Sequence, residues 1–180
     1  MGWFNVDKAG LASILERCGK AFALFELVQN AWDSGSNRVE ITLEPIPGQA
    51  YAVLTVQDWG EGFADSRDAF TMFGRSRRGA DPKKRGRFDL GEKLVLAVCR
   101  YAKIVTTTGS ILFEPDLRPR RATEKREAGT LFQAEIRMTR EEYEEVCRSI
   151  HRLIPPLTTT FNGSEITRVP PIATFRTKLP

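Results

Sequence analysis

Histidine is almost absent from this sequence, since His151 is the only one in 180 residues. A single imidazole excludes mechanisms that need two histidines, and most zinc sites built on histidine ligands. Cysteine is scarce too: Cys18, Cys99 and Cys147 are odd in number and lack the spacing of a metal site. We interpret them as buried thiols, which favours a reducing, intracellular (cytoplasmic) location.

Long apolar runs are also missing. No stretch approaches the ~20 residues that cross a bilayer, and residues 1–5 show no secretory-signal pattern, so neither a membrane partner nor secretion is expected. With 41% hydrophobic residues, the chain can still bury a core of its own. We predict one domain over residues 1–154. A hairpin-like tail over 155–180 is a candidate for the start of a following domain.

The positive charge is concentrated in one segment. The formal net charge is +4, yet residues 74–87 carry seven Lys and Arg side chains against the single acid Asp81. A loop of this charge can meet the phosphates of a nucleotide, the backbone of a nucleic acid, or water alone. Composition leaves these three possibilities open.

Hydrophobic periodicity divides the chain into helical and strand segments. Helices are predicted over residues 7–16, 20–34, 65–73, 91–100 and 139–153, the last opened by a Thr139–Glu142 capping box. Strands are predicted over residues 38–44, 51–57, 102–107, 111–113, 130–138 and 174–177, with a further hairpin over 158–167. Residues 115–128, with eight charges and two prolines, predict a solvated connection. The result is an α+β two-layer sandwich: a mixed, mostly antiparallel sheet with helices on one face.

A polar stripe interrupts the otherwise apolar helix over residues 20–34. Glu26, Asn30 and Asp33 are spaced i, i+4 and i+7, so they share one face. Burying them requires compensation, which a polar ligand with a metal would supply. The Asn30 oxygen suits Mg²⁺, and Glu26 could orient or deprotonate a water. The alternative is a surface stripe on an amphipathic helix.

Two further motifs lie at predicted strand ends. Asp58 follows a strand, and Gly60 and Gly62 allow either close approach to a flat ligand or a sharp turn. An aspartate there can accept a hydrogen bond from an exocyclic amine, although Asp-x-Gly-x-Gly taken alone favours a plain turn. Gly129-Thr130 opens the strand over 130–138, where the hydroxyl could bond a base or a bridging water. Threonine is also common at strand starts for no functional reason.

A glycine-bearing loop over residues 86–93 runs into a predicted helix N-terminus. Free backbone N–H groups at such an end, with Lys93 as an added positive charge, form an anion site. No Gly-Lys-Ser/Thr follows a strand, which excludes a Walker-type phosphate loop. The alternative is an ordinary loop-to-helix junction.

In this order and spacing, the four motifs resemble those of the GHKL ATPases, which share the Bergerat nucleotide-binding fold. Gyrase, heat-shock chaperones, histidine kinases, mismatch-repair and microrchidia-type proteins belong to this family. The resemblance covers roughly residues 20–137. It implies binding of ATP or ADP and slow Mg²⁺-dependent ATP hydrolysis. In a larger protein this would act as a conformational switch through an ATP-dependent homodimer.

The resemblance also implies roles for single residues. Glu26 would be the general base, Asn30 the Mg²⁺ ligand and Asp33 the support of the surrounding water shell. Nucleotide contacts would come, besides Asn30 and Asp33, from Asp58, Gly60, Gly62, Gly86, Gly91, Glu92, Lys93 and Thr130. The chain departs from the family pattern at Asp89, where many members have a glycine. A carboxylate there repels phosphates unless it points away or helps to bind metal.

Two alternatives accompany this hypothesis. The first is a nucleic-acid-binding module in which the basic lid over Arg75–Arg87 contacts DNA and nucleotide only regulates binding. The second is a histidine-kinase-like phosphotransferase. The presence of Glu26, and the lack of a visible helix carrying a phosphoacceptor histidine, disfavour the second.

Overall fold

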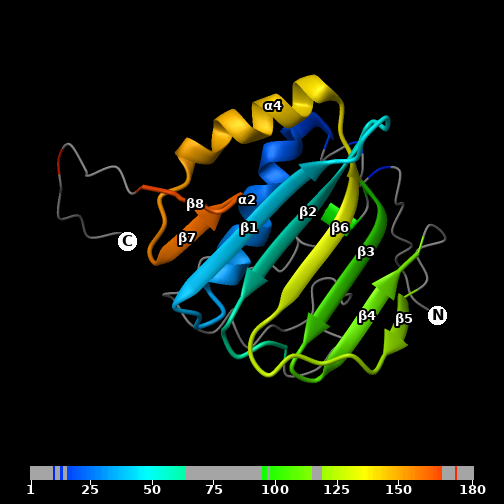
Figure 1. Ribbon diagram of the computed structural model, residues 1–180, viewed down its shortest axis with the longest axis vertical. Coiled ribbons are helices and arrows are strands. Elements are labelled where there is room, and N and C mark those ends of the chain that lie inside the picture. Colours follow the sequence, from blue (N-terminus) through cyan, green and yellow to red (C-terminus); the bar gives the residue numbers. More distant parts are fainter. Residues whose placement is uncertain are drawn as a thin grey trace.

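A mostly antiparallel sheet runs through the molecule, with α-helices on one face (Figure 1). The computed structural model describes residues 16–63, 98–114 and 119–167, together with five isolated positions (10, 13, 95, 96 and 173). The described residues form eight strands in the order β5-β4-β3-β6-β2-β1-β7-β8. Every neighbouring pair among them is antiparallel except β1 and β7, which are parallel. The predicted two-layer α+β architecture is confirmed.

The strands are β1 (Arg38–Pro45), β2 (Tyr51–Asp58), β3 (Cys99–Thr106), β4 (Gly109–Phe113), β5 (Pro119–Ala122), β6 (Leu131–Arg137), β7 (Thr158–Phe161) and β8 (Ser164–Glu165). The helices are α2 (Lys20–Trp32), α4 (Arg140–Ser149) and the short 3₁₀-helix η3 (Ile150–Arg152). The predicted capping box opens α4: Thr139 Oγ1 accepts from the Glu142 amide, and Glu142 Oε2 accepts from the Thr139 amide.

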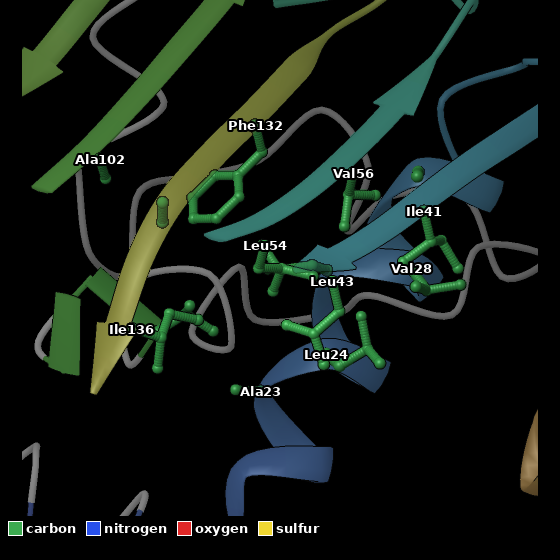
Figure 2. Packing of buried hydrophobic residues seen from close by; sticks show 14 of the residues in the cluster. Ala23, Leu24, Val28, Ile41, Leu43, Leu54, Val56, Ala102, Phe132 and Ile136 are labelled. Atoms are coloured by element: carbon green, nitrogen blue, oxygen red, sulfur yellow. The ribbon is translucent and has the colours of Figure 1, made fainter. Parts of the chain in front are cut away.

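Among the described elements, helix α2 makes most of the contacts between the helices and the sheet. Its Leu24 and Val28 are buried and lie toward Ile41 and Leu43 of β1 and Leu54 of β2 (Figure 2). Burial alternates along both strands, as a half-buried sheet requires. Each large apolar side chain removed from water contributes about 1.5–3 kcal/mol. This packing fixes the helix that carries the polar stripe.

Three sequence-based element assignments need correction. Cys99 and Arg100 were predicted to end a helix but begin β3, with a register irregularity between Cys99 and Tyr101. Pairing with β6 and an ion pair between Arg100 and Glu135 prevail there over local helical pattern. The connection predicted over 115–128 contains strand β5, whose proline stands first on an edge strand, a position that tolerates it. The strand predicted over 111–113 begins earlier, at Gly109, after a turn at 107–108.

The first part of the tail over 155–180, the candidate start of a following domain, joins the sheet of the preceding residues. Strand β7 pairs in parallel with β1, and Ile166 belongs to the apolar core. The Trp32 ring Nε1 donates to Thr159 Oγ1 at 3.0 Å, and Thr159 is only 1% exposed. A following domain stays a prediction.

Several predictions lie outside the described residues. These are most of the helix over 7–16, the helix over 65–73, the basic segment 74–87, the start of the helix over 91–100 and the strand over 174–177. Within the described part of the chain, no helix combines the length and apolar character needed to cross a membrane.

Candidate functional site: a pocket between helix α2 and the sheet

A pocket partly open to solvent, with about 440 Å³ of empty space that includes open solvent, lies between α2 and the central strands β2, β6 and β3. The ends of β2 and β3 meet the start of β6 there because β6 runs antiparallel to both other strands. The described lining residues are Leu27, Asn30, Ala31, Ser34, Val56, Asp58, Phe63, Ile104, Thr130 and Phe132. An apolar wall with a few convergent polar groups is typical of a site for a flat, partly polar ligand.

Asp58 is the single acidic residue among the described residues that line the pocket, and it is buried, with 4% of its surface exposed. Its Oδ1 accepts a hydrogen bond of 2.8 Å from the Gly60 amide, which holds the carboxylate at the start of the following turn. Its own amide donates to the Thr130 carbonyl at 2.9 Å. This bond joins the Asp-x-Gly-x-Gly motif directly to the Gly-Thr motif, so two predicted motifs form one wall.

Glycine is required where the loops meet. A Cβ on Gly60 would lie 2.2 Å from the Ser34 carbonyl oxygen, and one on Gly129 would lie 2.1 Å from the Asp58 carbonyl oxygen. Gly62 has φ +72, and a Cβ there would come within 2.6 Å of Thr106 Oγ1. Three segments distant in sequence therefore touch backbone to backbone. These close approaches explain why glycine occupies the two positions after Asp58, 60 and 62, and the position before Thr130.

Asn30, Asp58 and Thr130 are the predicted site residues that line this pocket. Glu26 lies one helical turn before Asn30, half-buried, outside the lining set. Burial raises the pKa of the Glu26 carboxyl above its ordinary value, since the charged form loses hydration there. Asp33 caps α2 with φ −82 and ψ 0, also outside the lining.

The loop residues predicted to hold phosphates, namely Gly86, Gly91, Glu92 and Lys93, lie outside the described residues, as does Asp89. The described lining of the pocket therefore tests none of these loop residues. Chemically, the Asn30 amide oxygen is the hard, neutral kind of ligand that Mg²⁺ accepts.

Sequence reasoning missed several residues that build the site. Ser34, at the end of the predicted helix over 20–34, was given no role in a site, yet it lines the pocket and its carbonyl accepts from the Glu61 amide at 3.0 Å. Thr106 Oγ1 accepts from the Phe63 amide at 2.8 Å, which fixes an aromatic wall. The alternation of β3 and β6 could place Ile104 and Phe132 on the inner face, but not beside a ligand.

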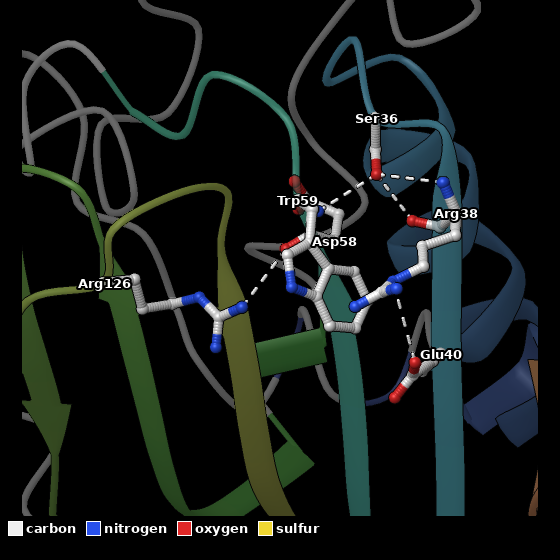
Figure 3. A network of polar contacts seen from close by, with 6 residues as sticks. All are labelled: Ser36, Arg38, Glu40, Asp58, Trp59 and Arg126. Atoms are coloured by element: carbon white, nitrogen blue, oxygen red, sulfur yellow. Dashed lines mark hydrogen bonds and ion pairs between the residues drawn. The ribbon is translucent and has the colours of Figure 1, made fainter.

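A second missed feature surrounds Trp59, the residue after Asp58 (Figure 3). Its amide donates to Ser36 Oγ at 3.0 Å. The Arg38 guanidinium carbon lies 3.8 Å from the centre of its ring, and that of Arg126 lies 5.8 Å away. Cation–π contacts of this kind favour a fixed ring orientation. The sequence gives no signal for these contacts of Trp59, because its partners Ser36, Arg38 and Arg126 come from two other segments.

Residues 19–145 match a protein family described as histidine kinase-, DNA gyrase B-, and HSP90-like ATPase. This chain belongs to that family. The match spans α2, the strands from β1 to β6 and the first part of α4, so it includes all four motifs. The GHKL resemblance inferred from the motifs is thereby confirmed, and it names a family of ATPases.

Solved structures show the same GHKL-type fold. The N-terminal domain of a DNA repair protein is 14% identical with a TM-score of 0.60, over 91% of this chain and 56% of that one. The ATPase region of Saccharomyces cerevisiae topoisomerase II is 12% identical with a TM-score of 0.56, over 81% and 48%. The same region bound to ICRF-187 (dexrazoxane) is 12% identical with a TM-score of 0.57, over 82% of this chain and 49% of that one. This GHKL domain thus spans about half the length of these structures. No curated protein matches its sequence.

Proposed function

We propose that this GHKL domain binds ATP in the pocket beside α2 and hydrolyses it slowly with Mg²⁺, as a conformational switch within a larger protein. One observation carries the proposal. Asn30, Asp58 and Thr130 come from three separate motifs and line a single cavity. Each motif alone has a structural explanation, but their convergence on one cavity in a member of an ATPase family favours a nucleotide site.

The buried end of the pocket suits adenine. Val56, Ile104 and Phe132 offer apolar surface to a flat ring, while Asp58 offers a buried carboxylate. A carboxylate accepts hydrogen bonds, so it favours the exocyclic amine of adenine over the carbonyl oxygen that guanine carries at the same ring position. The Thr130 hydroxyl would join this interaction directly or through a water. We therefore expect ATP and ADP to bind in preference to GTP.

The opposite end would hold the phosphates. Asn30 would be the protein ligand of Mg²⁺, and Asp33 would support the water shell. A bound Mg²⁺ would offset phosphate charge and orient the reacting group. Glu26 would accept the proton of the attacking water, and a carboxyl whose pKa is raised is better matched to that role near neutral pH. We assign Gly86, Gly91, Glu92 and Lys93 to the phosphates by the same reasoning, with Gly60 and Gly62 shaping the loop under the base.

Calorimetric titration with Mg-ATP and Mg-GTP tests the proposal. We expect ATP to bind and GTP to bind at least tenfold more weakly. Asp58→Asn should weaken ATP binding by about ten- to a hundredfold, because it loses a hydrogen bond to a charged acceptor. Glu145→Gln, an exposed change on α4, is the matched control and should bind like the wild type. Tight ATP binding by Asp58→Asn would contradict the adenine assignment.

The switch requires a change of assembly. We propose that ATP promotes homodimerisation, as the resemblance implies, and that further domains transmit it, because this chain spans about half of the matched structures. Size-exclusion chromatography with light scattering should show a larger species with Mg²⁺ and a non-hydrolysable ATP analogue than with ADP. An unchanged mass in both states would argue against dimerisation within this chain.

A further inference from the structure

We propose that Arg126 is a positioning residue for the adenine end of the pocket, acting through the peptide unit that joins Asp58 to Trp59. This inference rests on the proposed ATP binding. Arg126 does not line the pocket, so its effect on the nucleotide would be indirect.

The side chain of Arg126 bridges two loops that form the pocket wall. Its Nε donates to the Ala128 carbonyl at 3.1 Å, and its Nη2 donates to the Asp58 carbonyl at 3.4 Å. Its backbone amide donates to the Thr106 carbonyl at 3.1 Å, so the base of the side chain is anchored to the end of β3. Arg126 thereby links the ends of β2 and β3 to the loop that leads into β6.

The peptide unit after Asp58 is held from the other side as well (Figure 3). Ser36, 8% exposed, accepts from the Trp59 amide. The Arg38 guanidinium stacks on the indole and lies 3.8 Å from Glu40. Trp59 is therefore fixed at its amide and at its ring, while Arg126 fixes the carbonyl that precedes it. The Gly60 amide, one residue further on, donates to Asp58 Oδ1, so the position of this unit bears on where the Asp58 carboxylate lies.

Arginine suits this task better than lysine does. The rigid, planar guanidinium of Arg126 uses two nitrogens to reach the carbonyls of Ala128 and Asp58, which lie in different segments. The ammonium group of a lysine is a compact charge on a flexible stem. The guanidinium can also face an aromatic ring while it donates hydrogen bonds in its plane. A lysine at this position keeps the charge but not the two-loop bridge.

The location of the bridge predicts which part of the nucleotide is affected. Arg126 contacts the segments around Asp58 and Gly129, at the base end. Its loss should weaken ATP and ADP binding by the same factor. A residue that acts on the phosphates would change the ratio of the two affinities.

The test is calorimetric titration of ATP and of ADP into the 180-residue chain and its variants. For Arg126→Gln we expect about tenfold weaker binding of both nucleotides, as lost hydrogen bonds predict. Arg126→Lys should not restore the affinity. Arg140→Gln removes an arginine paired with Glu144 on exposed α4 and should bind like the wild type. Binding by Arg126→Gln within twofold of the wild type, or loss for ATP alone, would overturn the inference.

Tryptophan fluorescence supplies a readout that a purely structural role would not move. ADP should change the emission of the wild type, and the change should be lost in Trp59→Phe and reduced in Arg126→Gln. If circular dichroism shows that Arg126→Gln is unfolded, the affinity of Trp59→Phe for ADP is the test instead. Binding about threefold weaker than that of the wild type supports the inference, and wild-type affinity overturns it. Failure of the wild type to bind either nucleotide would instead overturn the proposed ATP site itself.

Discussion

The Gly129 amide donates a hydrogen bond of 2.7 Å to the Gly60 carbonyl, across 69 positions of sequence. The bond closes the pocket wall, since Gly60 follows Asp58 and Gly129 precedes Thr130. Neither partner has room for a side chain. Two motifs that look independent in the sequence are one structural unit, and substitutions in either should act on both.

Gly129→Ala should destabilise the fold strongly. The residue has φ +70, and its Cβ would lie 2.1 Å from a backbone oxygen, so the loop must shift as well as adopt a strained conformation. We expect a loss of about 3 kcal/mol or more in the free energy of unfolding, measured by urea denaturation. Gly48→Ala is the matched control, because its φ is +72 but no atom lies within 4 Å of its Cβ. It should cost only about 1–2 kcal/mol from the backbone conformation. Equal losses in the two variants would refute the steric argument.

Ser36→Ala should loosen the segment around Trp59. Ser36 Oγ accepts from the Trp59 and Arg38 amides and donates to the Arg38 carbonyl, all within a mostly buried site. Leaving these amides without their acceptor should cost about 1–3 kcal/mol and alter the tryptophan emission of the nucleotide-free protein. In Ser149→Ala, the control, the lost hydroxyl bonds only the Val146 carbonyl of its own helix. Its effect on stability should be smaller, with tryptophan emission unchanged. If Ser36→Ala changed neither the free energy of unfolding nor the tryptophan emission, Ser36 would not hold this segment in place.

Glu26→Gln should separate stability from turnover. Because burial raises the pKa of Glu26 in the folded state, the fold favours its neutral form. That contribution to stability is complete below the ordinary glutamate pKa and is lost as pH rises through the raised folded value. The melting temperature of Glu26→Gln relative to wild type should therefore increase from pH 4 to pH 7. A difference in melting temperature between the two proteins that stays constant from pH 4 to pH 7 would contradict this.

The same variant should keep ATP affinity but lose hydrolysis by about 10²- to 10⁴-fold, the usual contribution of a general base. A phosphate-release assay with saturating Mg-ATP measures this. Wild-type turnover would exclude Glu26 as the base.

Local pattern predicted much of this fold and site. The apolar run around Leu24 and Val28 favoured a buried helix, and the alternation of β1 and β2 indicated their inner faces. Asn30, Asp58 and Thr130 were predicted as site residues from their motifs, and all three line the pocket. Residue type and spacing carry this information because helix and strand periods are fixed.

What could not be predicted depends on tertiary partners. Cys99 and Arg100 have helical neighbours in sequence, but pairing with β6 draws them into a strand. The charged segment before Arg126 gives no local strand signal, yet it supplies the edge strand β5. In the sequence, Arg126 cannot be told apart from the other charged residues around it. Its role follows only from its hydrogen bonds to the Ala128 and Asp58 carbonyls.

The parallel pairing of β1 with β7 also has a kinetic consequence. β1 is the first strand described along the chain and β7 is the next to last, and the Trp32–Thr159 hydrogen bond spans 127 positions. Contacts of such separation form late, because the chain between them must be ordered first. During synthesis, the side of β1 that pairs with β7 therefore stays unpaired until residue 158 and those after it have been made. A chain shortened before that point would expose this edge of the sheet to pairing with other chains.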